Sequence, residues 1–281
     1  MMKKRILKET KGLSLIELLV ALGVSSILMA GLYRTYIGQQ RAYTVEDQVV
    51  DMQQNVRVSV GQMMREVRMA GYGGNILTAF GNVNGFTNII TPVYHANNVG
   101  TNDDSITIII AEQVSKLNQN AAKNSSDLDL NNPGSIFNTG TKKYLCLNGA
   151  NNYSVQSISG NTVTLATSLA EDHFQNEPVF LVKAITYKLQ WDQADPTMPV
   201  LVEDEHTGGG SQVIAENIER LQFHYTLSDG SVTDTPADPK TIQMISVDIT
   251  ARTKMPDPQL PGDGYRRRPL SSSVKVINLS L

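Results

Sequence analysis

The stretch Lys11-Gly12-Leu13-Ser14-Leu15-Ile16-Glu17-Leu18-Leu19-Val20 decides the fold of this chain, because a basic leader meets a glycine there and a long apolar run begins. From Leu13 to Tyr33 the chain has 21 residues and a single charge, that of Glu17. An α-helix needs about 20 apolar residues to cross the hydrocarbon core of a bilayer. The stretch therefore predicts a membrane-spanning helix that carries one acid.

The acid in this run, Glu17, needs a physical explanation. A carboxylate at membrane depth costs about 2.5–3.5 kcal/mol on insertion scales, so it is a functional hypothesis that calls for a partner. One alternative is that Glu17 lies near the cytoplasmic interface and reaches the headgroups. The other is that Glu17 pairs with a positive group, since opposite charges in a low-dielectric bundle relieve each other's burial cost only when paired.

Gly12 followed by Leu13, Ser14, Leu15, Ile16 and Glu17 resembles the prepilin signal of type IV pilins and type II secretion pseudopilins. The resemblance implies that a prepilin peptidase cuts between Gly12 and Leu13 and that Leu13 is then N-methylated. It also implies that Glu17 meets the amine of a neighbouring subunit and so sets the register of assembly. Leu13 stands where the family usually has Phe, a mild departure that still predicts cleavage.

The charges of the leader set the orientation of the chain. Residues 1–12 carry five bases and one acid, so their removal takes the formal charge from −3 to about −7. A basic flank before a first span tends to stay cytoplasmic, so the rest of the chain is expected in the periplasm. An acidic mature chain weighs against nucleic acid as a partner. The single cysteine, Cys146, excludes an intrachain disulfide and is expected to be a small buried residue.

A helical pattern continues beyond the membrane run. Apolar residues recur at spacings of three and four, as on one face of an α-helix: Val45, Val49, Met52, Val56, Val60, Met63, Val67 and Ala70. No proline occurs before Pro92, and glycines follow at 71, 73 and 74. We therefore expect one helix from Leu13 to Ala70, with a transmembrane half at 13–34 and a periplasmic half at 35–74.

Residues 75–281 change to short β-rich runs between Asn, Gly, Ser and Thr, which predicts one globular head with mainly antiparallel sheets and an α+β fold. The prepilin resemblance implies that this fold is type IV pilin-like. Ser159-Gly160-Asn161 predicts a tight hairpin, and 118–132 and 208–210 predict surface loops. The expected strands are 105–111, 142–148, 153–158, 162–167, 179–191, 200–203, 218–227, 242–253 and 273–281.

The end of the predicted helix, Met63-Met64-Arg65-Glu66-Val67-Arg68-Met69-Ala70-Gly71-Tyr72-Gly73, resembles the PilW family of minor pilins, as do segments 182–187, 216–225 and 266–279. The resemblance implies a minor pilin that primes the pilus or lies at its tip. Its partners would be prepilin peptidase, other minor and major pilins and the inner-membrane assembly platform. It would be located in the inner membrane with a periplasmic head, then in the pilus on the cell surface. Many relatives have a cysteine where this chain has Gly73 or Gly74, so no family disulfide is carried over.

Two alternatives to the minor pilin remain open at this stage. The first is a minor pseudopilin of a type II secretion system, which would use the same architecture for protein export. The second is an adhesin or ligand-binding head on a pilin stalk. The second alternative predicts that changes in the head loops abolish attachment while the number of pili stays normal.

Motifs that carry chemistry are weak in the head. The four histidines stand far apart, and neither a nucleophile elbow nor a phosphate-binding glycine loop is present, so neither an enzyme nor a cofactor is expected. Asp127, Asp129 and Asn131 are weak calcium candidates, although Asn132 and Asn138 replace the glycine and the glutamate that an EF-hand needs. The alternative is a solvated Asx-rich turn. The run 266–268 of three arginines lacks interleaved aromatic residues, which makes nucleic acid binding unlikely.

Overall fold

The computed structural model describes residues 14–72, 82–83, 86–87, 92–99, 103–192 and 194–279. The leader and both sides of the predicted cleavage site, Gly12 and Leu13, lie outside these residues. The chain divides into two compact units, Met1–Val50 and Asp51–Leu281. The boundary falls inside the long helix, so residues 51–68 of that helix belong to the β-rich unit.

Helix α1 runs from Leu15 to Arg68, which confirms the long N-terminal helix predicted at 13–70. Arg65 and Arg68 lie in its last turn, where positive charge complements the negative end of the helix dipole. Gly71 follows with φ +79°, and its N–H donates to the carbonyl of Ile109 at 2.9 Å. A Cβ at Gly71 would lie 3.2 Å from the carbonyl oxygen of Asn278, so the close approach of the chain there requires glycine.

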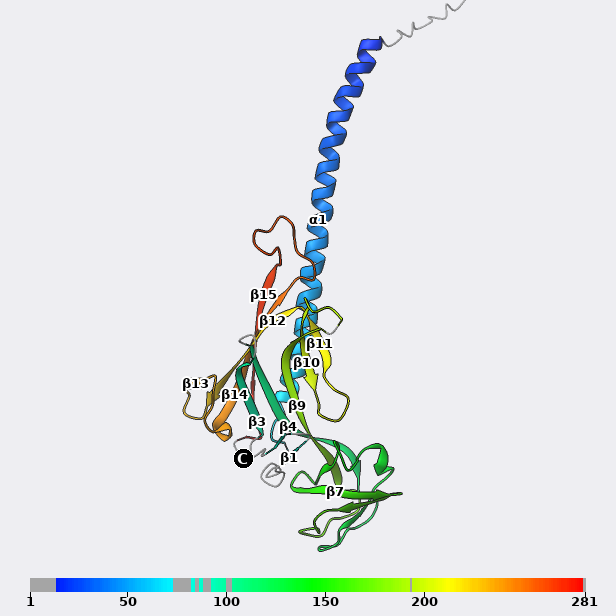
Figure 1. The fold of residues 1–281 in the computed structure, drawn as a ribbon, viewed down its shortest axis with the longest axis vertical. Coiled ribbons are helices and arrows are strands. Elements are labelled where there is room, and N and C mark those ends of the chain that lie inside the picture. The colour runs from blue at the N-terminus through cyan, green and yellow to red at the C-terminus, as the bar shows by residue number, and fades with distance from the viewer. Residues whose placement is uncertain are drawn as a thin grey trace, which may run out of the picture. The chain divides into compact units, whose positions relative to one another are not determined.

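Every strand pair in the described residues is antiparallel, and the α+β class predicted from the sequence is confirmed (Figure 1). The first sheet contains β3 (Val93–Val99), β4 (Asp103–Lys116), β5 (Asp127–Asp129), β6 (Tyr144–Leu147), β7 (Asn151–Ser159), β8 (Thr162–Leu165), β9 (Pro178–Trp191), β10 (Pro199–Asp204) and β11 (Gln212–Glu216). The second contains β12 (Ile218–Leu227), β13 (Val232–Thr233), β14 (Ile242–Arg252) and β15 (Arg267–Lys275). A two-residue pair, β1 (Asn82–Val83) with β2 (Phe86–Thr87), and two 3-10 turns, Pro133–Ser135 and Pro239–Thr241, complete the described elements.

Strand β9 is the centre of the first sheet. It pairs along one edge with β4, and along the other edge with β10 and β6. Residues 179–187 of this strand are buried without interruption, as expected for a strand covered on both faces. Cys146 on β6 is also buried, as predicted, and burial raises the pKa of its thiol to about 12. The thiol is therefore inert and serves packing.

Two aspartates join the two sheets. Asp103 and Asp104 begin β4, and both residues are buried. The carboxylate of Asp103 accepts a hydrogen bond from the backbone N–H of Leu221 at 3.1 Å, and that of Asp104 accepts one from Phe223 at 2.8 Å. These N–H groups belong to β12, so side chains of one sheet satisfy backbone donors of the other.

Strands β5 to β8 form a lobe with a core of its own, visible in green around β7 in Figure 1. Leu128, Leu145 and Val163 lie in this core, together with Leu181 from β9. The predicted hairpin at 159–161 is confirmed, because Ser159 pairs with Thr162 across Gly160, which has φ +58°.

The structure contains short strands that the sequence did not predict, among them β3 and β11, and it differs from the predicted elements at two further places. The predicted loop 118–132 contains β5, which pairs with β8, because its alternating side chains bury Leu128 and turn both flanking aspartates outward. The last strand lies at 267–275 and not at 273–281. Its pairing with residues 244–252 of β14 decides its position, and the apolar Val276 and Leu279 are buried beyond its end.

Candidate assembly site

The first described residues form the N-terminal cap of α1. The carboxylate of Glu17 accepts hydrogen bonds from the backbone N–H of Ser14 at 2.9 Å and from its hydroxyl at 3.0 Å. The hydroxyl of Ser14 in turn accepts from the backbone N–H of Glu17 at 3.3 Å. This reciprocal pair is a capping box, and it satisfies donors that the first turn of a helix leaves free. Ser14 and Glu17 stand three residues apart, which is the sequence signature of a capping box, but the box was not predicted from the sequence.

Behind the cap, α1 presents an apolar surface that no residue in the described ranges covers. All residues from 14 to 36 are exposed. Among the described residues, α1 is the helix that is long and apolar enough to cross a membrane, and its best 18-residue window has a mean hydropathy of 2.2 and is 0% buried. The hydroxyls of Ser26 and Thr35 donate to the carbonyls of Leu22 and Gly31 in the preceding turn. These internal bonds satisfy the two hydroxyl donors in a lipid or protein environment.

The second part of α1, residues 51–68, belongs to the core of the β-rich unit. Met63 and Val67 are 0% exposed. The helix is also fixed by polar contacts to the first sheet: the Ser59 hydroxyl donates to the carbonyl of Ile214 at 2.5 Å, and the Tyr187 hydroxyl donates to the Glu66 carboxylate at 2.5 Å. The sequence predicted this apolar stripe but not its polar contacts.

Carboxylates gather where α1 meets β9 and β10. Glu203 is buried, and its carboxylate accepts from the side-chain amide of Gln62 at 3.2 Å. Burial, together with the nearby charges of Glu66 and Glu205, raises the pKa of Glu203 to about 7, and Lys183 opposes the shift. We therefore expect the packing of the helix on the sheet to depend on pH.

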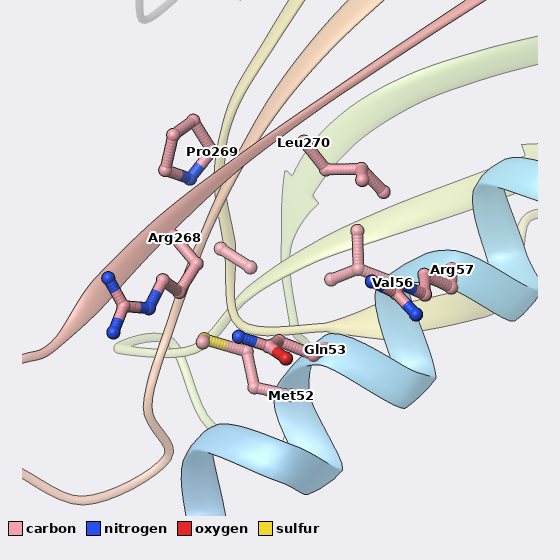
Figure 2. Close-up of a pocket in the computed structure, with 8 residues that line it drawn as sticks. Met52, Gln53, Val56, Arg57, Arg268, Pro269 and Leu270 are labelled. Atoms are coloured by element: carbon pink, nitrogen blue, oxygen red, sulfur yellow. The ribbon is translucent and has the colours of Figure 1, made fainter.

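The helix and the second sheet enclose a pocket of about 130 Å³, which we name the α1–β15 pocket. Its apolar wall comes from Met52 and Val56 of α1 with Leu270 of β15, joined by Ala251 and Pro269. In Figure 2 the side chains of Val56 and Leu270 face each other across the pocket. Gln53, Arg57 and Arg268 form its polar rim, and the Arg268 guanidinium extends away from the apolar wall.

The three consecutive arginines of the sequence have different roles. Arg266 pairs with Asp257 at 2.8 Å, and Arg267 pairs with Glu219 at 2.5 Å and also with Asp263. Arg268 has no ion pair with any residue that the structure describes. Two of the three positive charges are therefore neutralised within the chain, which removes most of the basic character that a nucleic acid would recognise.

The weak calcium candidates lie on and just after β5. The Asp129 carboxylate accepts from the side-chain amides of Asn118 at 2.7 Å and Gln119 at 2.8 Å, and the Asp127 carboxylate accepts from the Thr164 hydroxyl at 2.8 Å. Asn131 follows the strand. Within the described ranges, no three His, Cys, Asp or Glu side chains are gathered as metal ligands. A calcium site at these three residues stays a prediction.

Strand pairing assembles one polar cluster that the sequence did not predict. His224 on β12 lies between two carboxylates, with Nδ1 2.6 Å from Asp234 and Nε2 3.1 Å from Asp248. The hydrogen bond to Asp234 raises the pKa of His224, with Asp248 adding to the effect. The Ser271 hydroxyl donates to the carboxylate of Asp248, which the imidazole also contacts. The cluster is an ion-pair network on the outer face of the second sheet.

Comparison with known proteins gives one match. Residues 7–33 match a family model described as the prokaryotic N-terminal methylation motif. No curated protein and no solved structure matches the chain. The motif supports a type IV pilin or pseudopilin, which implies processing by prepilin peptidase and assembly with other pilins. This family is structural, and the motif together with the apolar half of α1 fits a pilin that is anchored in the inner membrane.

Proposed function

We propose that this chain is a minor pilin that takes part in assembling a type IV pilus, as a primer of the filament or as a subunit at its tip. One observation carries the proposal: the N-terminal methylation motif at residues 7–33 includes the exposed apolar start of α1, and the later residues of the same helix lie in the core of a β-rich unit. An exposed apolar surface of this length needs lipid or other helices to cover it. In a pilin, lipid covers this surface while the chain is in the membrane, and the helices of other subunits cover it in the filament.

The steps of this function follow from the first residues. Prepilin peptidase cuts between Gly12 and Leu13, and the new amine of Leu13 is methylated. The amine then lies one residue before Ser14, whose backbone N–H and hydroxyl already donate to the carboxylate of Glu17. Glu17 therefore presents its charge at the positive end of the α1 dipole. There it is available to the amine of a neighbouring subunit, which would set the register of assembly.

A minor pseudopilin of a type II secretion system is the second candidate, since the same motif occurs in both classes. The test is an in-frame deletion strain compared with the same strain carrying the wild-type gene. We expect sheared pili to be lost in the deletion and restored by the gene, while secretion of exported enzymes is unchanged. Normal pili with lost secretion would instead favour the pseudopilin. Normal pili and normal secretion with lost attachment would favour an adhesin.

A further inference from the structure

The rim of the α1–β15 pocket carries two arginines without a counter-charge. Arg57 and Arg268 are exposed, and neither has an ion pair with a described residue. The residues three and four positions from Arg57 on α1 are Gln53, Gln54, Val60 and Gly61, so the helix itself supplies no acid. By contrast, Arg252 and Arg267 nearby both pair with Glu219. The two free guanidinium groups therefore flank an apolar pocket that is open to a ligand.

A complementary surface occurs on the first half of α1. Tyr43, Glu46, Asp47 and Val50 lie at positions i, i+3, i+4 and i+7, which places them on one face of the helix. Tyr43 is 71% exposed and Val50 is 57% exposed. Neither Glu46 nor Asp47 has an ion pair with a described residue, and no Lys or Arg lies three or four positions away from them. We name these four residues the acidic stripe.

The sizes and charges of the two surfaces match. A cavity of about 150 Å³ in a protein core can hold a benzene molecule, so a pocket of about 130 Å³ has room for most of one aromatic ring. Tyr43 supplies such a ring, and Glu46 and Asp47 follow it by one helical turn. An aromatic anchor in a pocket, with charged pairs around it, is the usual arrangement of the residues that dominate a protein interface.

We propose that the α1–β15 pocket of one molecule receives the acidic stripe of a second copy of the same chain. Tyr43 of the second copy enters the pocket, and its Glu46 and Asp47 pair with Arg57 and Arg268. The contact joins two different surfaces, so each molecule keeps one surface of each kind free after it binds. A heterologous contact of this type leaves one free surface at each end and does not close as a symmetric dimer. The contact rests on the proposed function and deepens it, because a subunit that primes a filament must leave a surface open for the next subunit.

The test uses the full-length chain in native membranes, with two differently tagged copies in one cell. In one copy Tyr43 is replaced by p-benzoyl-phenylalanine, a photoreactive residue that keeps an aromatic ring at this position. We expect irradiation to give an adduct between the two tagged copies. Digestion and mass spectrometry should place the attachment at Met52, Val56 or Leu270. An adduct with another protein or with lipid would overturn the proposal, and so would the absence of any adduct.

Charge reversal separates a specific contact from random collision. R57E together with R268E in the receiving copy should lower the adduct by roughly tenfold or more, because like charges would then face each other. E46R with D47R in the photoreactive copy should restore it. The control R65E with K275E makes the same change on the same helix and strand, away from the pocket, and should leave the adduct unchanged. An equal loss in the control, or no rescue, would contradict the pairing.

The two proposals fail in different ways. Adduct formation is measured in the membrane, whereas the pilin role is measured as sheared pili and secretion in the deletion strain. An adduct without a pilus defect would remove the assembly role and keep the contact. A pilus defect without an adduct would remove the contact and keep the assembly role.

Discussion

At the scale of single residues, Glu17 is the side chain that we expect to act in assembly. Its carboxylate is bound by Ser14 of the same chain, at the end of the helix where negative charge is favoured. A single acid in an apolar helix is costly unless a cation meets it, and the amine of a neighbouring subunit is the cation that the prepilin-type motif implies. We therefore expect Glu17 to be needed for assembly and not for insertion.

The Glu17→Ala variant should still be inserted and cleaved, because the change removes a charge from the apolar helix and leaves Gly12 intact. Its amount in sheared filaments should fall by roughly tenfold or more, since the partner amine would lose its counter-charge. Quantitative immunoblots of membranes and filaments measure both quantities. Glu17→Asp keeps the charge and should incorporate better than the alanine variant, and equal incorporation of all three chains would remove the register role.

Glu203 is the residue whose ionisation acts on the folded state. Its pKa is about 7 in the fold against an ordinary value of 4.5, so the folded state holds the proton more tightly than the unfolded state. The stabilising effect of this proton is complete below pH 4.5 and is lost as the pH rises to about 7. Above that pH the fold carries a buried carboxylate near Glu66 and Glu205.

Glu203→Gln should therefore stabilise the β-rich unit at pH 8 by about 1–3 kcal/mol and have little effect at pH 4. The amide oxygen of the new side chain can still accept from Gln62, so the packing of α1 is retained. Thermal unfolding followed by near-ultraviolet circular dichroism at the two pH values measures the difference. Glu216→Gln, on the exposed edge strand β11, is the matched control. A gain of the same size at pH 4 and pH 8 would show that ionisation is not the cause.

At the scale of elements, the connection between the two sheets depends on Asp103 and Asp104. Both carboxylates are buried and accept from backbone N–H groups of β12. Hydrogen bonds to charged groups contribute more than neutral ones, and a buried donor left without a partner is costly. Along part of β12, these two carboxylates therefore supply the hydrogen-bond acceptors that a neighbouring strand would otherwise supply.

Asp104→Ala should lower the free energy of unfolding by about 1–3 kcal/mol, because the N–H of Phe223 would remain buried without an acceptor. Asp104→Asn retains an acceptor oxygen and should cost less. Urea unfolding of the two variants and the wild-type chain tests this order. If the asparagine variant were as unstable as the alanine variant, the hydrogen bond to Phe223 would not be the cause.

The sequence predicts elements well where side-chain periodicity decides them. The apolar stripe of α1, the continuous apolar runs of β4 and β9 and the alternating runs of β12 and β14 were all identified, although β4 ends five residues later than predicted. Strands β3, β5 and β11 were missed because their residues are polar or their runs short, and the pairing strand stabilises them. The cluster of His224, Asp234, Asp248 and Ser271 could not be predicted either, since strand register brings together residues that are far apart in the chain.

At the scale of the whole molecule, the unit boundary at Val50 and Asp51 predicts how the chain can be divided. A chain that begins at Asp51 keeps Met63 and Val67 in the core and should be soluble and folded. A chain that begins at residue 75 loses these side chains and should unfold or aggregate, because the sheets would expose their apolar faces. Size-exclusion chromatography and circular dichroism distinguish the two. Equal folding of both chains would show that α1 is dispensable for the β-rich unit.

The central claim is that this chain is processed as a prepilin, and the N-terminal peptide of the mature protein tests it most directly. Mass spectrometry of the protein purified from membranes should give a chain that begins at Leu13 with one added methyl group. Gly12→Ala should give only the uncleaved precursor with its basic leader. A wild-type chain that still begins at its leader, or one cut behind the apolar run, would contradict the account.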